Sequence, residues 1–70
     1  MARPVLIPID DYRELSLLAW SRHERTIPAR EALALYEAYW RFVDVQGMSE
    51  RERRLIDDLA REYGNGVLNV

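Results

Sequence analysis

The stretch that most constrains the fold lies near the start of the chain, at residues 3–9, where the sequence is RPVLIPI. Its β-branched residues Val5, Ile7 and Ile9 recur at every second position, which predicts one short strand. The two prolines of the stretch lie at the alternate positions, so their nitrogens point to the opposite edge of the strand. Because proline has no backbone N–H, this edge lacks two hydrogen-bond donors. The other edge, which carries the N–H groups of the three β-branched residues, is free to pair.

Two partners for this free edge remain, because the rest of the chain mostly favours helix. One is the weakly extended tail at residues 67–70. The other is the same strand of a second copy, which would make an intermolecular two-stranded ribbon. We expect the second arrangement, with Val5, Ile7 and Ile9 in the dimer interface, so the sequence predicts a homodimer.

The length of the chain also favours association. Seventy residues are near the lower limit for one stable core, and such chains are usually supported by disulfides, a metal or oligomerisation. There is no cysteine, and the one histidine, His23, has no carboxylates at the spacing of a metal site. We therefore expect no metal and no cofactor, and oligomerisation is the support that remains.

Three helices are expected after the strand, at residues 11–23, 27–46 and 50–63, with a tail at residues 64–70. The fold class is therefore mainly α, with an N-terminal β-strand followed by three helices in one domain over residues 1–70.

Each expected helix has a start signal. Asp10 or Asp11 is placed to cap the first, and Thr26, followed closely by proline, to cap the second. Ser49 and Glu52 have the spacing of a capping box at the start of the third.

The helix expected at residues 27–46 is apolar over much of its circumference. Leu33, Tyr36 and Trp40 form one of its two apolar stripes. In a chain this small, another chain is expected to cover one flank of such a helix. We therefore place these three residues in the predicted dimer interface.

The residues that catalysis needs do not occur together in this sequence. The serines lack a glycine elbow, and His23 lies in a charged segment between helices. Neighbouring carboxylates such as Asp57 and Asp58 diverge around a helix and do not form a dyad unaided. The sequence therefore predicts a protein without enzymatic activity and without catalytic residues.

Basic residues gather around the expected start of the second helix. Arg22, Arg25 and Arg30, set against Glu24, give residues 22–30 a local charge of +2. The free N–H groups and the dipole of a helix start also favour anions. A phosphate site and a solvated turn are both open interpretations of this segment.

The order strand, helix, short turn, helix over residues 3–45 resembles the ribbon-helix-helix family of bacterial DNA-binding proteins. The resemblance implies that the paired strands of two chains enter the major groove and that the start of the second helix holds phosphate. It implies a homodimeric transcriptional regulator. The residues that it assigns to nucleic-acid binding are Arg3, Arg22, Arg25, Thr26 and Arg30.

The predicted ribbon departs from that family in its side chains. Ribbons of the family present polar groups to the bases, whereas one face here has Pro4, Leu6 and Pro8. Arg3 is the one ribbon residue that can hydrogen-bond a base edge.

The alternative function is a protein-binding adaptor or an antitoxin-like interaction module. Residues 5–15 resemble the strand-to-helix segment of Phd/YefM antitoxins, and the net charge of −2 disfavours a general nucleic-acid binder. Tyr39 and Trp40 would be its anchors. Nothing resembles a signal peptide or a membrane span, so we expect a cytoplasmic protein with no membrane partner.

Overall fold

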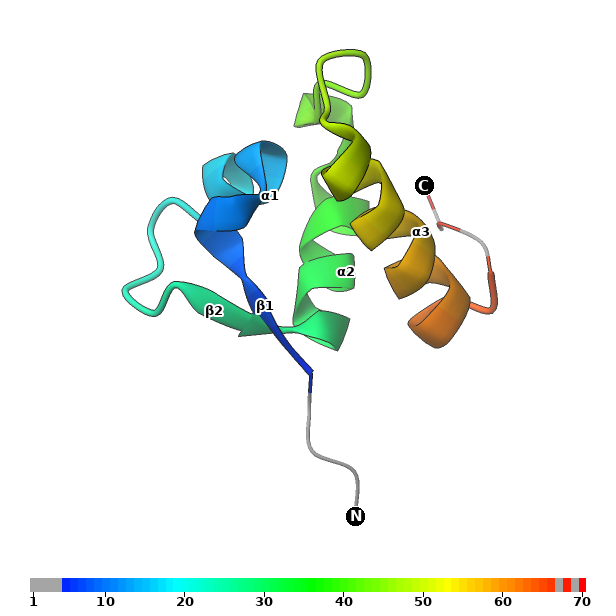
Figure 1. The fold of residues 1–70 in the computed structure, drawn as a ribbon, viewed down its shortest axis with the longest axis horizontal. Helices are drawn as coiled ribbons and strands as arrows, with labels where there is room; N and C mark the ends of the chain where they lie inside the picture. The colour runs from blue at the N-terminus through cyan, green and yellow to red at the C-terminus, as the bar shows by residue number, and fades with distance from the viewer. Residues whose placement is uncertain (1–4, 67, 69) are drawn as a thin grey trace.

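The computed structural model describes residues 5–66, 68 and 70. It shows a mainly helical domain with a two-stranded antiparallel sheet and three α-helices (Figure 1). In chain order the elements are β1 (Leu6–Pro8), the 3-10 helix η1 (Ile9–Asp11), α1 (Arg13–Leu18), β2 (Thr26–Pro28), α2 (Ala29–Ala38), the 3-10 helix η2 (Trp40–Phe42) and α3 (Glu50–Tyr63). In Figure 1, α2 lies between α1 and α3, and the sheet lies at the amino end of α2.

The pairing edge of β1 is the edge that the sequence predicts. β1 pairs with β2, and Ile7 stands opposite Ile27. The Ile9 N–H donates to the Arg25 carbonyl at 2.9 Å, so the hydrogen bonds run from the edge that carries the N–H groups of Val5, Ile7 and Ile9.

The partner of this edge differs from both expectations, which were residues 67–70 and a second copy. It is Thr26–Pro28 of the same chain, a segment expected to begin the second helix. A residue that precedes proline is sterically disfavoured in the helical region, and Ile27 precedes Pro28, so this segment is extended. The homodimer remains a prediction, but the strand edge on which it was based is already paired with β2.

The two described prolines of the sheet make its outer edges poor in donors. Ile7 and Ile27 form the hydrogen-bonded pair of the sheet, and Pro8 and Pro28 belong to the two neighbouring pairs. The backbone nitrogens of these prolines therefore face away from the partner strand. Neither nitrogen carries a hydrogen. Pro4, expected on the same edge as Pro8, lies outside the described residues.

The first helix is shorter than the expected residues 11–23, because α1 ends at Leu18 and the chain then turns toward β2. Its N-cap residue provides no side-chain cap. Asp10 forms an ion pair with Arg25, and Asp11 forms one with Arg51. The prediction that one of these aspartates caps the helix is therefore wrong.

The second helix was expected over residues 27–46, but α2 is helical over Ala29–Ala38 only. The residue at its N-cap position is Pro28, so Thr26 does not cap it. Beyond Ala38 the chain forms η2 and then a loop to Ser49.

Four of the six residues predicted at a dimer interface lie in the chain's own core. They are Ile7, Ile9, Leu33 and Tyr36. Trp40 packs partly buried against the same core, and Val5 is exposed. α2 is apolar on several sides because α1, α3 and the sheet of its own chain contact it. Its wide apolar surface therefore does not require a second copy.

The third helix is confirmed at its predicted bounds. The Glu52 N–H donates to the Ser49 hydroxyl at 3.1 Å, so Ser49 is the N-cap. Leu55, Ile56 and Leu59 turn toward the core, which places α3 against α2.

Candidate functional site

A fully buried carboxylate, that of Glu52, joins three helices. Its Oε1 accepts the Glu14 N–H at 3.0 Å, and its Oε2 accepts the Leu15 N–H at 2.9 Å. The Tyr36 hydroxyl donates to the same Oε2 at 2.6 Å. Glu52 of α3 therefore caps the amino end of α1, which supplies no cap of its own.

Glu14 is the second buried carboxylate, and it fixes the loop after η2. Its Oε1 accepts the Asp44 N–H at 2.9 Å, and Arg13 lies 3.9 Å from its other oxygen. Burial, and after it the hydrogen bond to Glu52, raise the pKa of the Tyr36 phenol above its ordinary value of 10.0. These buried groups have protein partners, so we assign them a structural role: they hold α1 at a set distance from α2 and α3.

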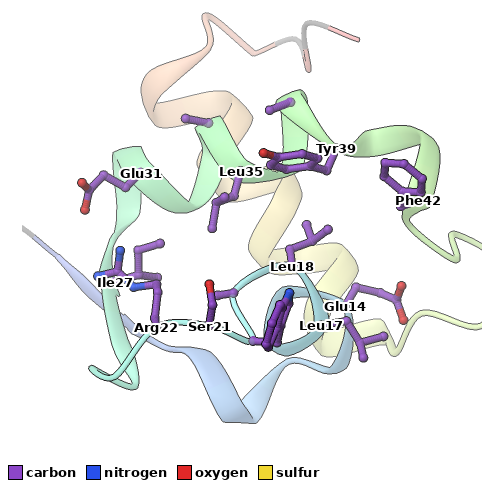
Figure 2. Close-up of a pocket in the computed structure, with 14 residues that line it drawn as sticks. Glu14, Leu17, Leu18, Ser21, Arg22, Ile27, Glu31, Leu35, Tyr39 and Phe42 are labelled. Carbon is purple, nitrogen blue, oxygen red and sulfur yellow. The ribbon is translucent and has the colours of Figure 1, made fainter.

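A groove of about 810 Å³ runs between α1 and α2 (Figure 2). We call it the α1–α2 groove. One wall is α1 with the segment after it, and the other is α2 with Tyr39 and Phe42, the residue before η2 and its last residue. β2 contributes Ile27 at one end. The lining residues are Glu14, Leu17, Leu18, Ala19, Trp20, Ser21, Arg22, Ile27, Glu31, Ala34, Leu35, Ala38, Tyr39 and Phe42.

The large apolar side chains around this groove are exposed. Trp20 is 79% exposed, Phe42 65% and Leu17 59%, and Tyr39 also has much of its surface free. Single exposed apolar residues are common on proteins, but a contiguous group along a groove is typical of a contact surface. Leu18 and Leu35, both half-buried, lie deeper between the walls (Figure 2).

Two opposite charges stand at one end of the α1–α2 groove. Arg22 follows α1 and Glu31 belongs to α2, and Figure 2 shows both near Ile27. The Arg22 Nε is buried and has no hydrogen-bond partner among the described residues. Neither side chain forms an ion pair within residues 5–66, 68 and 70. Their charges are therefore free to meet a partner.

Two of the residues predicted to hold phosphate, Arg25 and Arg30, have partners within the chain. Arg25 donates to both oxygens of Asp10 and to the carbonyls of Ala19 and Arg22. Arg25 therefore ties the loop between α1 and β2 to η1.

The Arg30 guanidinium lies 5.3 Å from the centre of the Tyr63 ring, which it covers in a cation–π contact. Thr26 is exposed in β2, and the Ala29 N–H at the start of α2 donates to the Val5 carbonyl at 2.8 Å. Arg3 lies outside the described residues. Arg25 and Arg30 therefore already have partners within the chain, and the phosphate site remains a prediction.

Within the described part of the chain, no three His, Cys, Asp or Glu side chains are placed to hold a metal ion. No helix among the described residues has the length and apolar character needed to cross a membrane. Comparison of the chain with protein-family models, with curated proteins and with solved structures gives no match.

The α1–α2 groove was not predicted from the sequence. The helical spacing of Leu17 and Trp20 predicts that both lie on one side of the helix expected at residues 11–23 and widen its apolar inner face. In the structure α1 ends at Leu18, and Trp20 lies in the turn that follows. The sequence signal that indicates this surface is the pair Leu17 and Trp20, two large apolar residues three positions apart. Both lie outside the apolar stripe that faces the core, and a polar segment follows them.

Proposed function

We propose that this chain is a non-enzymatic protein-binding module whose α1–α2 groove receives an apolar helical segment of a protein. The observation that carries the proposal is the set of exposed apolar side chains, Leu17, Trp20, Tyr39 and Phe42, along a groove between two helices. Large aromatic side chains are the commonest anchors of protein interfaces.

A helix is the partner element that suits this surface. Grooves between helices accept the ridges of a third helix. The exposed Ala34 and Ala38, one turn apart on α2, allow a backbone to come close to that wall. Addition of a strand to the sheet is disfavoured, because Pro8 and Pro28 remove outward N–H donors from both strands.

DNA binding of the ribbon-helix-helix type remains a prediction with less support. The edge meant for a ribbon between chains pairs with β2, and Arg25 and Arg30 are bound to Asp10 and Tyr63. A protein partner would use surface that is free, whereas DNA binding of this type would use Arg25 and Arg30, which already have partners.

Site-specific photocrosslinking in cells that produce the full chain tests the protein-binding proposal. We replace Trp20 with a photoreactive phenylalanine analogue and use the exposed Arg54 on α3 as the matched control position. We expect adducts at position 20 that map to peptides with apolar residues at helical spacing. The substitution Ala38→Arg fills the groove and is expected to abolish these adducts. Equal labelling at positions 20 and 54, or none at position 20, would overturn the proposal.

A further inference from the structure

We infer that the occupant of the α1–α2 groove is a second copy of this chain, related by a twofold axis that runs along the groove. The inference rests on the proposed function, because it names the partner of the same surface. In this arrangement, the α1 wall of each copy packs on the α2 wall of the other.

The exposed apolar area is large enough for such an interface. An aromatic side chain has roughly 150–250 Å² of surface. The exposed fractions of Trp20, Tyr39 and Phe42 therefore leave on the order of 400 Å² of aromatic surface free. A stable interface buries about 800 Å² on each partner. These three residues supply about half of that area, and Leu17, Ala34 and Ala38 adjoin them along the groove.

The shapes of the two walls suit a twofold arrangement. A rotation of 180° about an axis parallel to the groove keeps the position of each residue along the groove and exchanges the two sides. A residue on the α1 wall of one copy therefore faces the residue at the same level on the α2 wall of the other copy. Leu17 on the α1 wall and Phe42 on the α2 wall lie toward the same end (Figure 2). Each Leu17 then packs on the Phe42 of the other copy. In this arrangement the exposed Trp20 of each copy faces the α2 wall of the other copy, which includes the small residues Ala34 and Ala38.

The charges follow the same symmetry. Arg22 and Glu31 stand on opposite walls at the other end of the groove (Figure 2), and neither has an ion-pair partner among the described residues. The twofold axis brings each Arg22 to the Glu31 of the other copy, which gives two equivalent ion pairs. A different partner would have to present an acid and a base at these two positions, whereas a second copy supplies both by symmetry.

A mixing experiment with charge-reversed variants tests this arrangement. In Arg22→Glu, two acidic side chains face each other across the interface, and in Glu31→Arg two basic ones do. We expect wild-type protein to sediment as a monomer–dimer equilibrium at micromolar concentration and each variant alone to sediment as a monomer. An equimolar mixture of the two variants restores opposite charges at both contacts, so we expect it to form a heterodimer.

Controls separate the interface from general charge effects. The same mixing of Arg54→Glu with Glu62→Arg, two exposed sites on α3 outside the groove, is expected to leave the equilibrium of each variant at its wild-type position. Trp20→Ser is expected to be a folded monomer by circular dichroism and sedimentation. This variant keeps the test decisive if a charge-reversed chain fails to fold.

Three results would overturn the inference: a monomeric wild type, a dimer that Trp20→Ser leaves intact, or a mixture of charge variants that stays monomeric. If one of them is found while position 20 still crosslinks to a helical segment of another protein in cells, the protein-binding proposal stands and the second copy is excluded. If position 20 forms no adduct with any protein, including a second copy, both proposals fail.

Discussion

The Glu52 carboxylate of α3 accepts the backbone N–H of Leu15 at the start of α1, 37 positions earlier in the chain, at 2.9 Å. A side chain of one helix thereby supplies the cap of another. Because α1 has six residues, it is too short to be stable by itself. The carboxylate is one reason that it is helical, and α1 forms one wall of the α1–α2 groove.

The first prediction concerns this cap. Glu52→Ala leaves three buried donors without an acceptor, and each unsatisfied group costs about 1–3 kcal/mol. We expect the free energy of unfolding to fall by at least about 3 kcal/mol in urea denaturation followed by circular dichroism. Glu52→Gln, which keeps one acceptor oxygen, is expected to lose less. The exposed Glu50→Ala is the matched control and is expected to change stability by less than about 0.5 kcal/mol. Equal effects at positions 50 and 52 would contradict the capping role.

The second prediction concerns pH. The pKa of Tyr36 is raised in the folded chain by burial and by its bond to Glu52, whereas the unfolded chain keeps the ordinary value of 10.0. Below pH 10 both states hold the phenol proton, so the contribution of Tyr36 to stability is complete. Above pH 10 the unfolded chain releases the proton first. Stability then falls by up to about 1.4 kcal/mol per pH unit from this one group.

Urea denaturation at a series of pH values from 8 upward measures this loss. Tyr36→Phe is expected to be less stable at neutral pH by about 1–2 kcal/mol, because it removes the bond to Glu52. It is also expected to have a shallower decline above pH 10 than the wild type. Parallel declines in the two proteins would show that Tyr36 is not the group responsible.

The fold was predictable where local sequence signals and packing agree. Ser49 and the amphipathic segment after it predicted α3 at its observed bounds, because a capping hydroxyl, an apolar stripe and a terminal glycine mark both ends. The pairing edge of β1 was also predictable, since proline chemistry is local. Thr26–Pro28 was not recognised as a strand, because three residues are too few to show an alternating pattern.

The contacts that shape the candidate site depend on residues far apart in sequence. Glu52 has the spacing of a capping box, and that local interpretation assigns its side chain to its own helix. Its actual partners lie on α1 and α2. Arg25 looked like part of a basic patch because sequence cannot show that Asp10, 15 positions away, neutralises it. Charge patterns indicate partners only when the neighbours in space are known.

The third prediction separates the two tryptophans. Trp40 packs against the core, so Trp40→Ala is expected to lower the free energy of unfolding by about 2 kcal/mol or more. Trp20 is 79% exposed, so Trp20→Ala is expected to change it by less than about 0.5 kcal/mol in dilute solution, where copies do not meet. Chemical denaturation of both variants at low protein concentration measures the difference. A large loss at position 20 would mean that its indole supports the fold and is not a free contact group.

The last prediction concerns Arg25, which the sequence pattern assigns to phosphate binding and which forms an ion pair with Asp10 in the structure. The hydrogen bond from Arg25 is the main cause that lowers the pKa of the Asp10 carboxyl. In Arg25→Ala we expect this pKa to rise toward its ordinary range, as measured by NMR titration of the Asp10 side chain. The Arg25 side chain also donates to the Ala19 and Arg22 carbonyls. Its loss is therefore expected to speed hydrogen exchange of the Ile9 N–H, which donates to the Arg25 carbonyl. Arg30→Ala leaves this loop untouched and is the matched control. An unchanged Asp10 pKa in Arg25→Ala would mean that the pair does not persist in solution, and Arg25 would again be available to an anion.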